Sequence, residues 1–387
     1  MSHDTDESLN NATTPASAGE TRETYAKAFD RPADPLAEYS DIFYDLPDPF
    51  DYFINTVLLK KTNITSESTL AEYRRTYRQW RNYMEPTNRH PACPSPIHVS
   101  GFIEWRRDVH QNSRRHIKGK LNRLIRAYEH WQAESVFPHP DDFNPFTLAR
   151  ERTDLGTNNT KPFHDPSLEV LQEEFAAIEN IRNRAVIATQ LKEGCRVGEV
   201  CNMQLQDIHI SHSEIQDRYS ELGTHPALEG RQDAVYIPHD RDGNKSSNPR
   251  LLPIDEELRW VLLQHLIMRP QVDKPWVFLS KTSFSQLGPK DVNRMWKDVF
   301  HPKFAETETR KAITSHFGRH WFSSHWRLNV GLEREHVQYM RGDRVTPIDE
   351  FPDAIDDYLH PNYDHIERVY RNNIFKLDLP MRHYVSD

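Results

Sequence analysis

Apolar residues recur at helical spacing over much of the chain, and the first clear example begins near residue 69. Thr69-x-x-Glu72 is a capping-box signature for the start of a helix, and Pro86 marks the end of the pattern. Between them, apolar residues recur every three or four positions, which places them on one side of a helix. These residues are Leu70, Tyr73, Tyr77, Trp80 and Met84. A helix with one buried side is therefore predicted.

The next stretch combines helical periodicity with a concentration of positive charge. A short helix is predicted at about residues 97 to 110. A longer helix follows, with apolar residues at Ile117, Leu121, Leu124, Ile125 and Tyr128. The basic residues of the stretch, opposed only by Asp108, are Arg106, Arg107, Arg114, Arg115, Lys118, Lys120, Arg123 and Arg126. An amphipathic helix with a basic outer face suits a phosphate backbone. The alternative is a solvated basic face without a ligand.

The second half of the chain mixes helical patterns with a few short β patterns. Helices are predicted at about residues 167 to 180, 182 to 193 and 196 to 203. A short β run follows at residues 207 to 210, and DAVYIP and RLLPID form a hairpin around the turn Asp242-Gly243. Helices then dominate to the end. The predicted fold is mostly α with a small β-sheet, and its second domain is α+β.

Changes in composition divide the chain into four parts. Residues 1–48 are rich in Ser, Thr, Asn and Asp, with 3 Lys or Arg against 11 Asp or Glu, and are predicted to be a disordered acidic tail. Residues 49–150 form a helical domain. Residues 151–164, which include DLGTNNTKPFHDPS, form a linker, and residues 165–387 form the second domain.

The charge distribution makes a nucleic-acid partner plausible despite a net charge of −9. Residues 51–150 hold 16 Lys or Arg against 10 Asp or Glu, so the positive charge gathers in the helical domain. The chain has no long apolar segment and no secretion signal, so no membrane partner is predicted and the cytoplasm is the expected location. Cys93, Cys195 and Cys201 have no metal-knuckle spacing and are expected to be reduced core thiols.

Four separated segments carry residues suited to phosphate chemistry. EGCRVGEVCNMQLQDIHI carries Arg196 and Glu199, GNKSSNPRLLPI carries Lys245, SHFGRH carries His316 and Arg319, and DDYLHPNYDHIERVY carries Tyr358.

In order and context these segments resemble the tyrosine recombinase (phage integrase) family. The catalytic domain of that family presents an Arg, a Lys on a β-hairpin, His-x-x-Arg and a nucleophilic Tyr. The resemblance covers about residues 60 to 377, because the first helices resemble the family's helical, SAM-like core-binding domain. It implies a site-specific recombinase or integrase that cuts and rejoins double-stranded DNA without a metal or other cofactor. It also implies a tetramer on two DNA sites, formed from a monomer or weak dimer.

The residue types fit this chemistry. In-line attack by a tyrosine builds negative charge on the non-bridging phosphate oxygens, and Arg196 and Arg319 are the candidates to neutralise it. Glu199, one helical turn after Arg196, is a candidate to orient it. Lys245, the only lysine between Lys192 and Lys274, is the candidate acid for the leaving 5′ oxygen.

Tyr358 is the candidate nucleophile, which would become covalently joined to the 3′ phosphate. The Tyr358-Leu359-His360 stretch resembles the family's sequence around its nucleophile. Tyr363 and Tyr370 are the nearby alternatives. Tyr370, however, falls in the apolar stripe of a final helix, which also contains Ile366, Val369, Ile374 and Phe375. In the family, segments after the nucleophile dock on a neighbouring protomer, so this stripe is expected to form an interface; the alternative is that it folds back on its own domain.

The histidines of SHFGRH raise the question of a metal. A zinc site at His316 and His320 would need a third ligand and usually a Glu between them, and an arginine beside a dication is unfavourable. No metal is therefore predicted. His316 is interpreted as a phosphate donor or proton relay, and His320 and His325 as packing or polar helix residues.

Two positions depart from the family pattern. Gly318 stands where Leu is common. Asp343, in MRGDR, stands where the family's Leu-Gly-His segment has His or Trp, and a carboxylate cannot donate to phosphate unless it is protonated. Asp343 is therefore expected to orient a neighbour, or another residue supplies the bond to phosphate. The alternative functions are a type IB topoisomerase-like enzyme and a non-catalytic DNA-binding relative.

Overall fold

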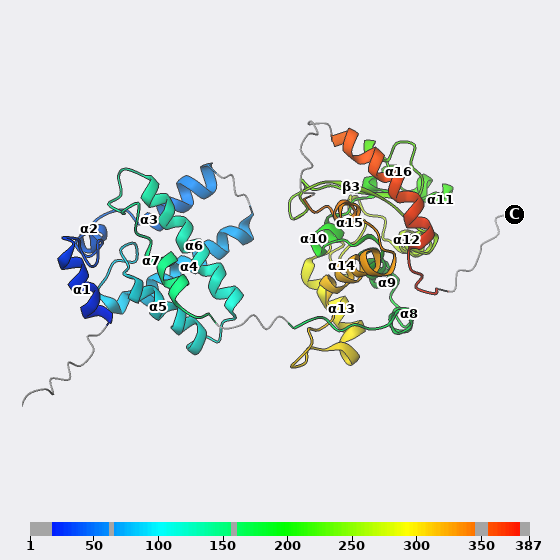
Figure 1. Cartoon of the computed structure of the whole chain (residues 1–387). Helices are drawn as coiled ribbons and strands as arrows, with labels where there is room; N and C mark the ends of the chain where they lie inside the picture. The colour runs from blue at the N-terminus through cyan, green and yellow to red at the C-terminus, as the bar shows by residue number, and fades with distance from the viewer. Residues whose placement is uncertain (1–17, 62–65, 156–160, 345–354, 380–387) are drawn as a thin grey trace, which may run out of the picture. The chain divides into compact units, whose positions relative to one another are not determined.

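The computed structural model of the chain describes residues 18–61, 66–155, 161–344 and 355–379. These residues form two compact units, Met1–Asn159 and Thr160–Asp387, each with its own hydrophobic core (Figure 1). The division falls within the segment predicted as a linker. No helix in the described ranges is both long and apolar enough to cross a membrane.

The N-terminal unit is helical. Its α-helices are α1 (Ala18–Ala28), α2 (Ser40–Tyr44), α3 (Pro49–Phe53), α4 (Glu67–Met84), α5 (Pro96–Glu104), α6 (Arg114–Ala133) and α7 (Pro145–Arg152), with π-helical turns at Ile54–Lys61 and Trp105–Val109 and a 3-10 turn at Glu85–Thr87. Side-chain caps fix several helix starts; Asp48 accepts hydrogen bonds from the amides of Phe50 and Asp51. Aromatic residues fill the core, where Phe50 packs between Tyr77 and Trp131.

The apolar side predicted for α4 is confirmed, because Leu70, Tyr73, Tyr77, Trp80 and Met84 are all buried. The predicted capping box is wrong. The helix begins at Glu67, after Ser66, and Thr69 lies inside the first turn.

The prediction of a disordered tail also needs correction for the described residues after 17. The helix α1 forms, and Leu36 and Phe43 lie in the core of the N-terminal unit. These two apolar side chains offset part of the entropy of ordering a segment that its overall composition describes as polar. Residues 1–17 lie outside the described ranges.

The C-terminal unit combines helices with a small sheet. Its α-helices are α8 (Leu168–Ala176), α9 (Ile181–Glu193), α10 (Val197–Asn202), α11 (Ser213–Arg218), α12 (Glu256–Met268), α13 (Pro289–Phe304), α14 (Ser315–Ser324), α15 (Arg334–Arg341) and α16 (Ile355–Asn373). Its 3-10 turns are Leu205–Asp207 and Pro226–Leu228, and His325–Asn329 is π-helical. The strands β1 (Ile208–His209), β2 (Ala234–Ile237) and β3 (Arg250–Pro253) form an antiparallel sheet in that order. The predicted fold class is confirmed.

The helix α9 runs through the core of this unit. Its residues from Ala185 to Glu193 are buried, and it packs against α12 and α14. It ends at Gly194, which has φ +59°, so the chain turns sharply and delivers Arg196 to the start of α10. The buried helix thereby fixes the position of the first candidate arginine.

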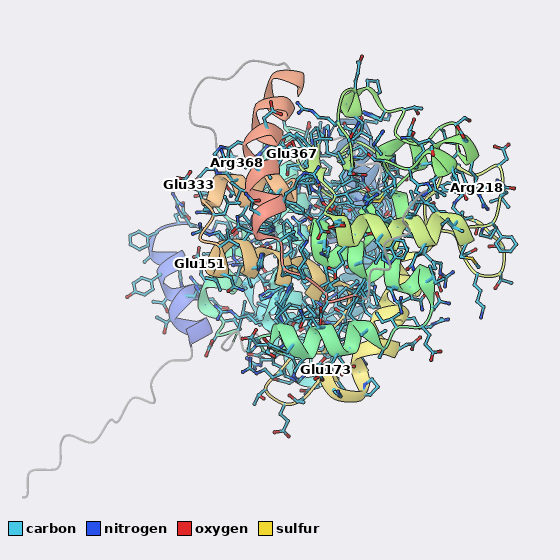
Figure 2. All side chains as sticks on the ribbon, turned by 90° about the vertical axis from the view of Figure 1, so that its right-hand side faces the viewer. Glu151, Glu173, Arg218, Glu333, Glu367 and Arg368 are labelled. Carbon is cyan, nitrogen blue, oxygen red and sulfur yellow. The ribbon has the colours of Figure 1, made fainter. Side chains whose placement is uncertain are left out.

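The final helix α16 packs on β3 of its own unit (Figure 1). Ile366 and Tyr370 of this helix, and Ile374 and Phe375 just after it, are at most 6% exposed and belong to the core. Glu367 and Arg368 lie on the polar side of the helix (Figure 2). The expectation that this stripe docks on a neighbouring protomer is wrong. The folded unit already buries it, which is the alternative that the pattern alone left open.

The segment after α16 is also tied to its own unit. The buried ammonium of Lys192 lies 2.7 Å from Asp255 Oδ2 and 2.7 Å from Glu257 Oε2, and it donates to the carbonyl of Phe375. Glu257 in turn accepts from the amides of Leu377 and Leu379. A buried charge cluster therefore holds residues 375 to 379 against α9 and α12.

Candidate active site

Arg196 lies at the junction between α9 and α10. Its backbone amide donates to Glu199 Oε2 at 2.7 Å, which completes a capping box at the start of α10. Its guanidinium donates through Nη1 to Ser246 Oγ at 2.9 Å and through Nη2 to Asp343 Oδ1 at 2.7 Å. The structure thus places Glu199 where it fixes both the backbone and the side chain of Arg196.

Glu199 is buried and also binds a residue that the sequence did not single out. Arg250, which opens β3 and is fully buried, donates to Glu199 Oε2 at 2.6 Å, and Ser246 donates to Oε1. Burial raises the pKa of Glu199, but the charge of Arg250 and the hydrogen bonds from Arg250 and Ser246 outweigh it and bring the pKa to about 2. The one signal for Arg250 in the sequence was an arginine next to the apolar run of a predicted strand.

Arg319 approaches the same point from α14. Its Nη1 donates to the carbonyl of Gly194, and its Nη2 donates to the carbonyl of Arg341 and to Asp343 Oδ1 at 2.7 Å. Burial, followed by the charges of Arg250 and Arg196, lowers the pKa of Arg319 to about 9, which leaves it cationic near pH 7. Both candidate arginines therefore point at one anionic oxygen.

Asp343 reaches that point because of the turn that ends α15. Gly342 has φ +62°, and a Cβ atom there would stand 2.7 Å from Arg250 Nη1 and 2.8 Å from the carbonyl of Asn248. The carbonyl of Gly342 accepts from the amide of Ser247 at 2.9 Å. Only glycine fits this left-handed close approach, so the turn holds Asp343 against the arginines.

Lys245 is exposed, and it lies in the loop between β2 and β3 rather than on a strand. Asn202 of α10 holds this loop by donating to the carbonyl of Asp242 and to Asn244 Oδ1. Gly198 allows the loop to approach, because a Cβ there would lie 2.5 Å from the carbonyl oxygen of Gly243. Lys245 is thus next in sequence to Ser246, which contacts Arg196.

His316 and His320 lie on α14 and line a pocket of about 340 Å³ together with Arg319 and Arg341. Partial burial, then the charge of Arg319, lower the pKa of His316, so it is neutral near pH 7. The ring of His320 lies 5.2 Å from that of Phe163, and His325 instead packs inside the unit and hydrogen-bonds to the carbonyl of Asn373. Among the described residues, no group of three or more His, Cys, Asp or Glu is arranged to hold a metal.

Gly318, where the family commonly has Leu, is packed against a tryptophan. A Cβ there would lie 3.0 Å from the ring of Trp296 and 3.2 Å from the Cβ of Gln190. Trp296 fills the space and donates to Gln190 Oε1 at 2.6 Å. The departure at Gly318 therefore has a steric reason in this chain.

The candidate nucleophile Tyr358 belongs to α16, but its side chain lies outside the described part of the structure. Tyr363 is buried, with the guanidinium of Arg231 4.7 Å from the centre of its ring. Tyr370 is buried and donates to the carbonyl of Lys192. Burial raises the pKa of both phenols.

The candidate DNA-binding residues of the N-terminal unit are exposed, paired with a carboxylate, or buried. On α6, Arg114, Arg115 and Lys118 are exposed. Arg107 pairs with Asp108, and Arg123 lies 3.7 Å from Glu72.

Arg106 and Lys120 were predicted on the outer face, and that prediction is wrong. Each is 6% exposed; Arg106 donates to Asn112 Oδ1, and Lys120 donates to Gln79 Oε1 at 2.7 Å. Burial, then the charges of Arg106 and Arg75, lower the pKa of Lys120 to about 8. Long aliphatic stems allow such residues to pack inward while their charged ends find polar partners.

Known proteins resemble this chain in sequence and in fold. Residues 168–343 match the model of the phage integrase family, a segment that contains Arg196 and Arg319 and ends at Asp343. Tyrosine recombinase XerD of Caulobacter vibrioides is 29% identical over 131 residues, which cover 32% of this chain and only 41% of XerD. Tyrosine recombinase XerC of Halalkalibacterium halodurans is 24% identical over 339 residues, which cover 84% of this chain and 97% of XerC.

Solved integrases share the fold. A lambda integrase dimer bound to a COC′ core site aligns with a TM-score of 0.57 at 13% identity, covering 87% of this chain and 88% of that one. The integrase of the Tn1549 transposon, solved with a circular intermediate DNA, aligns with a TM-score of 0.54 at 15% identity, covering 76% and 91%. The family match and the two recombinase relatives support the phage integrase family of tyrosine recombinases for this chain, and the solved integrases share its fold.

Proposed function

We propose that the protein is a site-specific recombinase that cuts and rejoins duplex DNA through a covalent 3′-phosphotyrosine. The observation that carries this proposal is the convergence of Arg196 and Arg319 on one anionic oxygen, each at 2.7 Å. Two guanidiniums at that spacing suit a phosphate whose non-bridging oxygens gain charge during in-line attack. The family match makes phosphodiester chemistry the natural assignment.

In this mechanism the Tyr358 oxygen attacks the phosphorus and the bond to the 5′ oxygen breaks. Lys245, at the edge of the site, supplies the proton for the leaving 5′ oxygen. Neutral His316 acts as a phosphate donor or proton relay. A 5′ hydroxyl from another strand then attacks the phosphotyrosine, which restores the phosphodiester and releases Tyr358.

We propose that residues 49–150 grip the DNA, mainly through the exposed basic residues of α6. The charge on this face favours backbone contacts, which position a duplex without reading its sequence. A lambda integrase tetramer has been solved on a Holliday junction, at a TM-score of 0.56 and 13% identity, covering 79% of both chains. A tetramer on two DNA sites is accordingly proposed for this protein too.

A non-catalytic DNA-binding role is the second candidate, and one observation favours it. The carboxylate of Asp343 occupies the point on which both arginines converge. A site permanently filled in this way would bind DNA without cutting it. A type IB topoisomerase-like enzyme remains the alternative within the catalytic class.

The test uses a pool of nicked duplexes with random sequence, from which covalent protein–DNA complexes are isolated under denaturing conditions. The wild-type protein is expected to form an adduct. Tyr358→Phe, which lacks only the nucleophilic oxygen, is expected to lose the adduct and keep its duplex affinity.

Tyr363→Phe is the matched control and is expected to form the adduct normally. Adduct formation by Tyr358→Phe would reject Tyr358 as the nucleophile. DNA binding without any wild-type adduct would favour the non-catalytic role. Strand exchange between two selected duplexes, rather than relaxation of one, distinguishes a recombinase from a topoisomerase.

A further inference from the structure

The family pattern leaves one phosphate ligand unaccounted for in this chain. Asp343 stands where the family commonly has His or Trp, and an ionised carboxylate has no proton to donate. Its Oδ1 instead accepts from Arg196 and Arg319, as a phosphate oxygen would. The structure therefore raises two linked questions, which residue replaces the missing donor and what the carboxylate does in the anion position.

Arg341 has the position and the chemistry of the missing donor. It stands two residues before Asp343, where the family's Leu-Gly-His segment has Leu, and it lines the same pocket as His316 and Arg319. Its Nε lies 2.9 Å from Asp343 Oδ2. An arginine at this place brings a third guanidinium to the anion site.

One hydrogen-bond donor of Arg341, its Nε, is unused among the described residues. Within the described residues its Nε is buried and makes no hydrogen bond, because the N–H does not align with the nearby oxygen of Asp343. A buried donor without an acceptor is costly. Arg327, which lines the pocket together with Arg319 and Arg341, instead donates to the carbonyl of Leu332. A phosphate, with more oxygens than a carboxylate, would satisfy Arg341.

We propose that Arg341 is a third phosphate-binding residue of this site, and that the Asp343 carboxylate is an internal anion which the DNA phosphate displaces. The assignment deepens the proposed function, since it concerns the same site. Three guanidiniums around an empty point repel one another, so the carboxylate stabilises the free protein. Displacement exchanges one set of charge-assisted hydrogen bonds for another and adds the unused bond of Arg341.

The test measures binding of inorganic phosphate at constant ionic strength in chloride buffer, by calorimetry and by the shift in melting temperature. Asp343→Asn keeps the shape of the side chain and removes its charge. It is expected to bind phosphate about tenfold more tightly than the wild type, or better, the effect of one charge-assisted hydrogen bond.

Arg341→Ala in the Asp343→Asn background is expected to weaken phosphate binding about tenfold. Arg334→Ala, an exposed arginine on the same helix, is the matched control and is expected to leave it unchanged. If Asp343→Asn does not fold, the comparison is made in the wild-type chain, where Arg341→Ala but not Arg334→Ala is expected to weaken binding.

Unchanged phosphate affinity in Asp343→Asn would reject the internal anion, and equal effects of Arg341→Ala and Arg334→Ala would reject Arg341 as a ligand. A purely structural ion pair predicts a lower melting temperature in Asp343→Asn that phosphate does not restore; that result also overturns the proposal. Neither measurement uses DNA or Tyr358, so a failure here is distinguishable from a failure to form the covalent adduct.

Discussion

Among single residues, Glu199 makes the connection on which the candidate site depends. Glu199 is buried, and it holds Arg196 through the capping box and Arg250 through an ion pair at 2.6 Å. The buried Arg250 is therefore linked to Arg196 through Glu199. We propose that Glu199 is a positioning residue that acts through Arg196.

Glu199→Gln is expected to lower the free energy of unfolding by about 3–5 kcal/mol, because Arg250 would be left charged and unpaired in the interior. The exposed pair Lys161–Glu306 provides the control, and Glu306→Gln is expected to cost less than about 1 kcal/mol. Urea unfolding measures both. A loss below about 1 kcal/mol for Glu199→Gln would contradict the role given to this ion pair.

The same variant tests the pH dependence. The pKa of Glu199 is about 2 in the folded protein, below the ordinary value of 4.5. Its contribution to stability is thus fully present above pH 4.5 and is lost as the pH falls toward 2. The difference in unfolding free energy between wild type and Glu199→Gln is expected to shrink over that window.

At the scale of elements, α16 is part of the core of its unit and not a free arm. Tyr370 of this helix donates to the carbonyl of Lys192, four residues before Arg196. The helix that carries Tyr358 is therefore anchored to the segment that carries the first arginine. This connection fixes the part of α16 that follows residue 363.

The double variant Ile366→Asp with Ile374→Asp is expected to unfold the C-terminal unit, since each change places an unpaired carboxylate in an apolar core. Circular dichroism and tryptophan fluorescence measure the loss. The exposed position Arg368, changed to Asp, is the control and is expected to keep the fold. A folded double variant that fails only in paired-site assembly would restore the interface that the structure argues against.

The exposed basic residues of α6 lead to a separate prediction about the salt dependence of DNA binding. Changing Arg114, Arg115 or Lys118 to Ala is expected to flatten the slope of log affinity against log salt by up to about 0.9 for each phosphate that the variant no longer neutralises. Lys120→Met is the contrasting variant. It removes a buried charge and is expected to leave the salt slope unchanged. If all four variants keep the salt slope of the wild type, the exposed face of α6 is a solvated surface that does not contact DNA.

The molecule has two separate hydrophobic cores, and the two proposed roles divide between them. One core contains Trp80 and Trp131, and the other contains Trp296 and Trp326. The proposed DNA grip belongs to the first unit and the anion site to the second. Because each core is complete within one unit, each unit has the means to fold alone.

Fragments Met1–Asn159 and Thr160–Asp387 are accordingly expected to fold separately, each with a cooperative thermal transition. The first fragment is expected to keep most of the salt-dependent duplex affinity, and the second to keep phosphate binding. Calorimetry and the two binding assays measure these outcomes. If either fragment is unfolded, its stability depends on the other unit, and the assignment of one binding activity to each independently folding unit is wrong.

The fold class, the helical periodicities and the types of residue at the site could be predicted from the amino-acid sequence. Period and spacing are local properties, so α4, α6 and the β2–β3 hairpin could be predicted from their own residues. Arg196, His316 and Arg319 could also be predicted as site residues, because a family motif is defined by residue types and their order in the sequence.

Which charged side chains meet could not be predicted, because it depends on how distant segments pack. Arg250 and Asp343 acquire their roles from residues far away in sequence, and the burial of Lys120 depends on Gln79 of another helix. The apolar stripe of α16 was compatible with a core and with an interface, and packing against β3 selected the core. A pattern shows that a side chain must be buried or paired, but its partner is fixed only when distant segments fold together.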